Sequence, residues 1–177
     1  MLSLKNTQNN LSIKLDVLGY QIETTNGSED DDWVNIQVEI NHDGNSFKKV
    51  DPSLLAGELS VIYWWFLSLS ERSIPDESIF STFDGCLLFS FIQSYDDKIL
   101  ISITFDGELE PDFEINQVHP LYQRGGLYLE TPGIHPYGTE IIFELQKDDY
   151  PAILEGLKET AKKYPKRSSQ PSALDDL

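Results

Sequence analysis

The sequence predicts an α+β fold, in which a single mainly antiparallel sheet packs against a central helix at residues 51–70 and a C-terminal helix at residues 149–164. Three observations support this prediction. Runs of alternating apolar and polar residues, typical of half-buried strands, stand on both sides of residues 51–70. Two Asp-Gly pairs, at positions 43–44 and 84–85, separate such runs and favour tight hairpin turns. Residues 51–70 instead repeat their apolar side chains at helical spacing.

Strands account for most of the first fifty residues. Residues 1–10 are polar, and we expect them to be frayed. The alternation over residues 11–20 predicts the first strand. Residues 23–32 hold an Asn-Gly turn signal and a run of four acids, which predicts a loop. The alternation resumes over residues 34–40, and the following Asp-Gly pair predicts a hairpin whose return strand covers residues 47–50.

The run from residue 51 to residue 70 predicts the main helix. Asp51 suits the N-cap position, and Pro52 suits the first helical position, where its missing N–H group costs nothing. The apolar residues of this run share one helix face, which predicts that they enter the core. They are Leu55, Leu59, Ile62, Phe66 and Leu69.

Trp64 lies about half a turn away from this apolar face, on the same side as Ser60. Two arrangements are compatible with its position. A segment that wraps the outer face of the helix could cover it, and this is the arrangement that we expect. Alternatively, Trp64 stands exposed as an aromatic anchor for a partner, since tryptophan is enriched among the residues that dominate binding energies.

The sequence after the helix predicts four more strands. Two of them, at residues 78–83 and 86–94, flank the second Asp-Gly pair. A third covers residues 99–105, and a fourth covers residues 139–146. In the third strand the residues expected to point outward are Leu100, Ser102 and Thr104.

Residues 110–138 hold four prolines and a Gly-Gly pair and show no regular periodicity. Loops of this length are uncommon in compact domains unless they are functional or cover another element. Residues 149–164 predict the closing helix, with acids near its start, lysines near its end and Pro165 as its stop. We therefore expect one α+β domain over residues 1–165, followed by a polar tail at residues 166–177.

Charge is the strongest signal in the composition. Thirty Asp and Glu residues stand against thirteen Lys and Arg residues, which leaves a formal net charge of −17 at pH 7. A field of this sign repels phosphate backbones, so the sequence argues against direct nucleic-acid binding and favours a cationic partner. Acidity that only maintains solubility is the alternative explanation.

The sequence predicts a cytoplasmic protein that contacts no membrane. No run approaches the roughly 20 consecutive apolar residues of a membrane span, and the first ten residues lack the apolar centre of a secretory signal. A single cysteine, Cys86, stands in an apolar stretch. No disulfide can form within the chain, and we expect a buried structural thiol.

No catalytic or cofactor motif is recognisable. The three histidines, His42, His119 and His135, are far apart and fit no metal-binding pattern. The acids at residues 29–32 lack the spacing of a calcium-binding loop. Nothing places two of the acids at residues 108–114 across a cleft, as hydrolytic chemistry requires. The sequence therefore predicts no enzyme, no metal site and no cofactor.

Five short motifs, spread over most of the chain, resemble those of one bacterial family. They are Gly19-Tyr20-Gln21, Asp32-Trp33, Asp51-Pro52-Ser53-Leu54-Leu55, Phe143-Glu144-Leu145 and Lys163-Tyr164-Pro165-Lys166-Arg167. With them the chain resembles the WapI-type immunity proteins, which protect a cell from the toxic domain of a wall-associated or contact-dependent polymorphic toxin. The resemblance implies a binding protein and brings no catalytic residues with it.

The charge and the resemblance together predict an immunity protein that binds a cognate toxin, expected to be a cationic nuclease domain, and occludes it with an acidic surface. The residues expected to contact the toxin are Glu29, Asp30, Asp31, Asp32, Trp64, Glu108, Glu110, Asp112 and Glu114. Two alternatives remain open. One is an adaptor or structural protein that forms a homodimer, and the other is a metal-dependent hydrolase that uses an acidic cluster.

Overall fold

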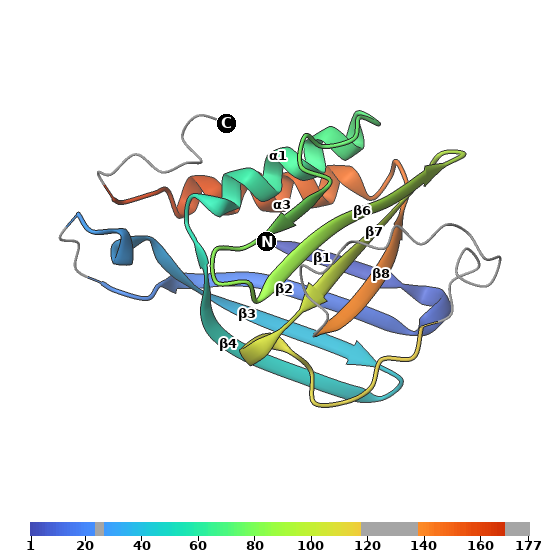
Figure 1. Ribbon diagram of the computed structural model, residues 1–177, viewed down its shortest axis with the longest axis horizontal. Helices are drawn as coiled ribbons and strands as arrows, with labels where there is room; N and C mark the ends of the chain where they lie inside the picture. Colours follow the sequence, from blue (N-terminus) through green and yellow to red (C-terminus); the bar gives the residue numbers. More distant parts are fainter. Residues whose placement is uncertain (24–26, 118–137, 169–177) are drawn as a thin grey trace.

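The computed structural model describes residues 1–23, 27–117 and 138–168 of the chain, and it confirms the predicted α+β class (Figure 1). The prediction of a single sheet is wrong. The strands in the described ranges form two four-stranded antiparallel sheets, in the orders β1-β2-β3-β4 and β5-β6-β7-β8.

The first sheet contains the strands β1 (Leu2–Asn6), β2 (Leu11–Tyr20), β3 (Trp33–His42) and β4 (Asn45–Leu55). The second contains β5 (Ile79–Ser81), β6 (Leu87–Tyr95), β7 (Lys98–Phe105) and β8 (Thr139–Leu145). The helices are α1 (Glu58–Ser70) and α3 (Tyr150–Lys163), and three short 3-10 turns join the strands, η1 (Thr7–Asn9), η2 (Glu29–Asp32) and η3 (Gly107–Leu109). None of the helices in the described ranges is both long and apolar enough to span a membrane.

Strand β1 replaces the predicted frayed terminus. Leu2 and Leu4 are buried on one face of the strand, which pairs with β2. The side-chain amide of Asn6, at the end of β1, donates a hydrogen bond to the carbonyl of Ile142 in β8 (3.2 Å), so the first sheet meets the second here. The prediction fails because two apolar residues among polar neighbours are too short a pattern to indicate a strand.

Helix α1 begins at Glu58, so the predicted N-cap role of Asp51 is wrong. Strand β4 continues through Asp51 and Pro52 because it remains paired with β3. The register of this pair shifts between Val34 and Ile36 of β3, opposite Pro52. An irregularity on an edge strand is the kind of place in a sheet that tolerates a residue without an N–H group. Tertiary pairing therefore overrides the local helix-start signal.

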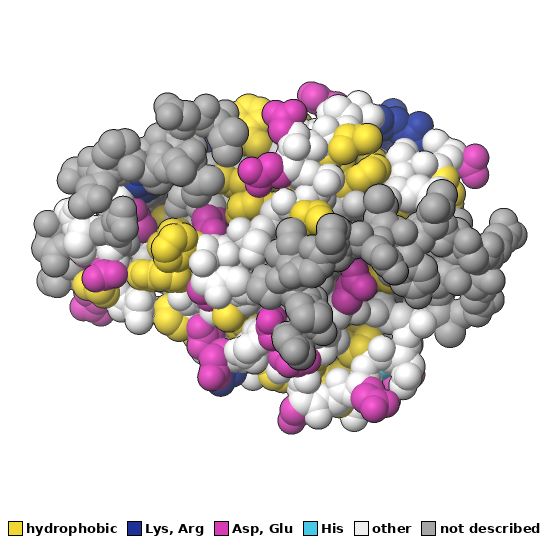
Figure 2. Space-filling view, in the orientation of Figure 1, with side chains coloured by type: hydrophobic (Ala, Val, Ile, Leu, Met, Phe, Trp, Pro, Cys, Tyr) yellow, Lys and Arg dark blue, Asp and Glu magenta, His cyan; other side chains and the backbone are white. Residues whose placement is uncertain are grey.

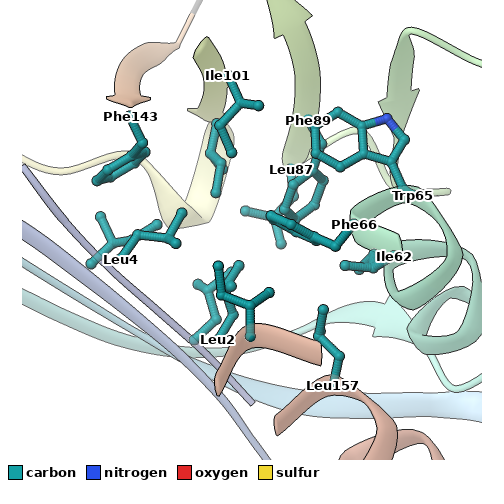
Figure 3. Packing of buried hydrophobic residues seen from close by; sticks show 14 of the residues in the cluster. Leu2, Leu4, Ile62, Trp65, Phe66, Leu87, Phe89, Ile101, Phe143 and Leu157 are labelled. Carbon is teal, nitrogen blue, oxygen red and sulfur yellow. The ribbon is translucent and has the colours of Figure 1, made fainter. Parts of the chain in front are cut away.

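One hydrophobic core joins both sheets and both helices. The predicted apolar face of α1 is confirmed from Leu59 onward, since Leu59, Ile62, Phe66 and Leu69 are fully buried. Figure 3 shows residues from both sheets and both helices converging: Leu2, Leu4, Ile62, Phe66, Ile101, Phe143 and Leu157. Helices α1 and α3 lie side by side along the sheets (Figure 1).

Both predicted Asp-Gly hairpins are confirmed. Strands β3 and β4 are joined through Asp43 (φ +48°) and Gly44 (φ +87°), the left-handed conformations that a tight hairpin turn requires. Strands β5 and β6 pair on either side of Gly85 (φ +80°). The closing helix is also confirmed, as α3 has Pro151 in its first turn.

The predicted outward face of β7 is wrong. Leu100, Ser102 and Thr104 are all buried, as are the residues between them. Strand β7 is a central strand, with β6 on one side and β8 on the other, and both of its faces are withdrawn from solvent. Small hydroxyl residues in an alternating pattern do not by themselves indicate exposure.

Most of the predicted irregular region, residues 118–137, lies outside the described residues. Residues 110–117, the first part of this region, run back onto the first sheet. There the Asn116 N–H group donates to Nε2 of the buried His42 (3.2 Å). The Gln117 side chain continues the contact along β8, donating to the Glu140 carbonyl (2.6 Å) and accepting from the Ile142 N–H group (2.7 Å). The segment after η3 is therefore held against both sheets.

Candidate partner-binding surface

The acidic run predicted as a loop forms η2, and its last two side chains are buried. Oδ2 of Asp31 accepts hydrogen bonds from the backbone N–H groups of Gly27 (2.6 Å) and Ser28 (3.1 Å). Such N–H groups at the start of a helical turn have no carbonyl acceptor within the turn. The Asp31 carboxylate is therefore used within the fold.

Asp32 holds the C-terminal end of the described chain. Its Oδ1 accepts hydrogen bonds from the backbone N–H groups of Arg167 (2.5 Å) and Ser168 (3.1 Å). The Arg167 guanidinium lies over the ring of Tyr20, 3.3 Å from its centroid, and donates to the Ile22 carbonyl (2.9 Å). Three of the motifs that resemble the immunity family thus meet in one structural contact, in which a buried carboxylate and a cation–π pair hold Arg167 and Ser168 beside the end of strand β2.

The side chain of Asp30, another of the acids in η2, is exposed. The placement of the Glu29 side chain lies outside what the structure describes. Because Asp31 and Asp32 are used inside the fold, the run presents much less negative charge to a partner than the sequence predicts. Of the acids in η2 whose side chains are described, only Asp30 is therefore a candidate contact residue.

Trp64 stands on the outward side of α1 and is 58% exposed, so the expectation that a segment covers it is wrong. Its ring packs edge to face against Tyr63, its neighbour in the same helix, with 5.5 Å between the ring centroids. One turn away on either side stand Ser60 and Ser68, which carry no charge. Trp64 is therefore an exposed aromatic residue whose neighbours one turn away along α1 are uncharged.

The acidic segment, residues 108–114, presents its carboxylates to solvent. The side chains of Glu108, Glu110, Asp112 and Glu114 are all exposed. The residues between them point the other way: Leu109 and Pro111 are buried, and Phe113 and Ile115 pack against the core at partial exposure. An alternation of this kind fixes the backbone on its apolar side and leaves four negative charges on the other side.

The acidic segment is partly neutralised at one end. Nζ of Lys49, on the edge strand β4, lies 3.0 Å from Oε2 of Glu108, and both side chains are largely exposed. At the next acid, Oε1 of Glu110 accepts a hydrogen bond from the Thr139 hydroxyl (3.2 Å). The other two carboxylates, of Asp112 and Glu114, have no ion pair among the described residues.

Sequence reasoning missed Phe83. This residue is 76% exposed at the tip of the turn between β5 and β6, and its ring packs edge to face against Trp33 with 6.0 Å between centroids. We define the Phe83 turn as residues 82–86. The available signal was the Asp84-Gly85 pair that follows directly, since an apolar residue placed inside a hairpin turn cannot enter a sheet face.

Hydrogen bonds within the Phe83 turn fix its shape. Oδ1 of Asp84 accepts from the Thr82 hydroxyl (2.9 Å) and from the Cys86 N–H group (3.0 Å). The Gly85 N–H group donates to the Thr82 carbonyl (2.9 Å), and Gly85 adopts φ +80°, a conformation that favours glycine. The turn therefore holds Phe83 in place with little freedom to rearrange.

A buried carboxylate ties the Phe83 turn to the start of α1. Glu58 is 3% exposed; its Oε2 accepts from the Leu55 N–H group and its Oε1 from the Phe83 N–H group, both at 2.7 Å. Burial raises the pKa of Glu58 to about 7, and the two backbone donors oppose this shift only in part. Near neutral pH the carboxyl group thus exists in both protonation states.

The Phe83 turn contacts a residue next to each of the predicted surfaces. Figure 1 shows η2, α1 and the segment after β7 in separate places, with the β5–β6 connection between them. Trp33 follows η2 directly, Glu58 opens α1, and the Asp106 N–H group donates to the Cys86 carbonyl (3.0 Å) just before the acidic segment. On the face in Figure 2, Asp and Glu side chains are spread among hydrophobic ones, and Lys and Arg are few.

The described residues offer no arrangement typical of a metal centre. Within residues 1–23, 27–117 and 138–168, no three His, Cys, Asp or Glu side chains are grouped closely enough to hold a metal ion. Cys86 is partly buried, and burial together with the nearby Asp84 carboxylate raises the pKa of its thiol to about 11. The thiol is therefore protonated at neutral pH and is a weak nucleophile.

Comparison with known proteins gives one match. Residues 2–165 match the sequence model of the immunity protein WapI-like family, a range that runs from the first residue of β1 to just beyond the end of α3. Neither the curated proteins nor the solved structures that were compared with the chain include a significant match. The match covers both sheets, both helices and the surfaces described above, and the chain therefore belongs to the WapI-like immunity protein family.

Proposed function

We propose that the protein neutralises a cognate toxin by binding a cationic nuclease domain and covering the surface that receives its nucleic-acid substrate. Membership of the WapI-like family supports the immunity role. The observation that carries the rest is the acidic segment, where four carboxylates project to solvent from a backbone anchored by buried apolar residues. A nuclease binds phosphate groups with Lys and Arg side chains, and exposed carboxylates offer those side chains negative charge and acceptor oxygens.

The charge and the anchored backbone each give such an inhibitor an advantage. The net charge of −17 steers a cationic domain toward the protein and raises the association rate. The anchored backbone of the acidic segment has already lost much of its conformational freedom before binding, so less entropy is lost on association. Asp30 and Trp64 are additional contact residues in our proposal. No step in the inhibition requires a metal ion or a cofactor.

The proposed function is tested with the toxin domain encoded beside the gene for this protein. Co-expression should restore growth to cells that produce the toxin domain, and the two purified proteins should bind with an affinity that falls steeply as the salt concentration rises. Inhibition of nuclease activity by a stoichiometric amount of the protein would identify the target activity. Loss of growth protection, or binding that salt does not weaken, would contradict the immunity role or the electrostatic mechanism respectively.

A further inference from the structure

The Phe83 turn combines features that binding surfaces use for an apolar anchor. Phe83 exposes 76% of its surface, yet its ring rests on Trp33 and its backbone is hydrogen-bonded to Glu58. Residues that dominate binding energies tend to be aromatic, rigid before binding and placed near the centre of an interface. An exposed phenylalanine in a fixed turn satisfies the first two conditions within the protein itself.

Three acids belong to the Phe83 turn or to the segment bonded to it. Asp84 belongs to the turn, and Asp106 and Glu108 belong to the segment that is hydrogen-bonded to it through Cys86. The Cys86 sulfur lies beside the backbone of Glu108 and would be 3.6 Å from a Cβ atom at Gly107. A partner that covers Phe83 therefore also approaches Asp84, Asp106 and Glu108, although Asp106 accepts a hydrogen bond from the Gly107 N–H group (2.7 Å) and Glu108 pairs with Lys49. The negative charge of these three acids favours basic side chains around an apolar recess.

Trp64 lacks this combination. It is exposed to a similar degree, but it stands in the middle of α1 between two serines, and its ring contact is with the adjacent Tyr63. Along α1, no carboxylate stands one turn away from it on either side. Charge complementarity with a cationic partner therefore favours the Phe83 turn as the centre of the contact.

We propose that Phe83 is the apolar anchor of the toxin-binding surface, inserting into an apolar recess of the toxin domain whose rim carries Lys or Arg side chains that pair with Asp84, Asp106 and Glu108. This inference rests on the proposed function and adds the position of the contact and the chemistry of the partner surface. The ring fills the recess and excludes water, and the surrounding ion pairs fix the orientation. The acidic segment then continues the contact outward from the anchor.

Kinetics separates the anchor from the surrounding charges. Packing in a recess affects mainly the dissociation rate, whereas exposed charges affect mainly the association rate and its salt dependence. With the purified adjacent toxin domain as the probe, Phe83→Ser should raise the dissociation rate on the order of tenfold or more and leave the salt dependence of association unchanged. Phe83→Leu, which keeps an apolar side chain, should lie between Phe83→Ser and the wild type.

Ile74→Ser is the matched control, because Ile74 is a comparably exposed apolar residue (65%) that follows α1 and lies outside the proposed surface. Its dissociation rate should equal that of the wild type. Thermal melting of each variant verifies that the fold is retained. The anchor role of Phe83 would be overturned if Phe83→Ser and the wild type had equal dissociation rates. It would also be overturned if Phe83→Ser and Ile74→Ser raised the dissociation rate equally. Failure of the wild type to bind would instead overturn the proposed function, so the two failures are distinguishable.

Discussion

The η2 turn and the acidic segment are both short runs rich in acids, yet the structure uses their carboxylates in different ways. In η2, Asp31 and Asp32 are buried and accept hydrogen bonds from backbone N–H groups. In the acidic segment, the carboxylates from Glu108 to Glu114 face solvent. The difference teaches that an acidic run indicates a binding surface only when its carboxylates are exposed and not buried as acceptors for backbone N–H groups.

Neighbouring residues explain the difference. In the acidic segment each acid is followed by an apolar residue, such as Leu109 or Phe113, and the apolar partners hold the backbone against the core. In η2 the acids are consecutive, so their side chains point in different directions around a tight turn. Asp31 and Asp32 face inward, where the backbone N–H groups of Ser28 and Ser168 require acceptors.

The largest expected effect is on stability, and it comes from removing the buried carboxylates of η2. The double variant Asp31→Ala/Asp32→Ala should lower the free energy of unfolding by about 3–4 kcal/mol, because four backbone N–H groups lose a charged acceptor. The melting temperature should fall by roughly 6–16 °C. The matched variant Asp112→Ala/Glu114→Ala should change the unfolding free energy by less than about 0.5 kcal/mol. Similar losses in the two variants, measured by urea unfolding, would remove the distinction between the runs.

The next effect concerns Glu58, a buried carboxyl group whose pKa of about 7 lies above the value of 4.5 for an unperturbed glutamate. The folded protein binds the proton more tightly than the unfolded chain. The stabilisation is therefore complete below pH 4.5 and is lost as the pH rises through about 7. We expect the free energy of unfolding to fall by about 2–3 kcal/mol between pH 5 and pH 8 from this group.

Glu58→Gln isolates that contribution. The amide does not titrate, so the difference in unfolding free energy between wild type and variant should change with pH over the same interval. The variant also loses one acceptor, because its NH₂ group faces the N–H group of either Leu55 or Phe83. The pH dependence of the difference, and not its absolute size, is the measured quantity. A difference that stays constant from pH 5 to pH 8 would contradict the raised pKa.

A smaller effect is expected on the rate at which the acidic segment associates with the toxin domain. Neutralising the acidic segment with Glu108→Gln, Glu110→Gln, Asp112→Asn and Glu114→Gln should slow association with the toxin domain about tenfold at low salt and flatten its salt dependence. A control with the same change in net charge is Glu71→Gln, Asp97→Asn, Asp148→Asn and Glu155→Gln, four exposed acids elsewhere in the chain. If both variants slow association equally, net charge alone is responsible and the segment has no special position.

The smallest expected effect concerns the ion pair at one end of the acidic segment. Lys49 and Glu108 form an exposed ion pair, so Lys49→Ala should change the free energy of unfolding by less than about 0.5 kcal/mol. Removing the lysine also leaves the Glu108 carboxylate without its basic neighbour, which should raise the association rate with the toxin domain by a small factor, about twofold. Slower association after this substitution would indicate that Lys49 itself contacts the toxin.

The sequence by itself determined the local elements and the family. Strand β2, the hairpins around Gly44 and Gly85, the buried face of α1 from Leu59 onward and the closing helix all follow from periodicity and turn residues. These signals are local, because they depend on the spacing of side chains along a few turns or strands. The five motifs that resemble the immunity family are equally local, and the family match extends over residues 2–165.

The tertiary structure alone decided how those elements are arranged and which side chains reach solvent. The division into two sheets, the continuation of β4 through Pro52 and the late start of α1 at Glu58 depend on pairing between distant strands. The exposure of Trp64 and Phe83 and the burial of Asp32 depend on which segments come to lie beside them. The physical reason is that burial and hydrogen bonding are set by contacts between residues far apart in sequence, such as Asp32 with Arg167, and no local pattern contains that information.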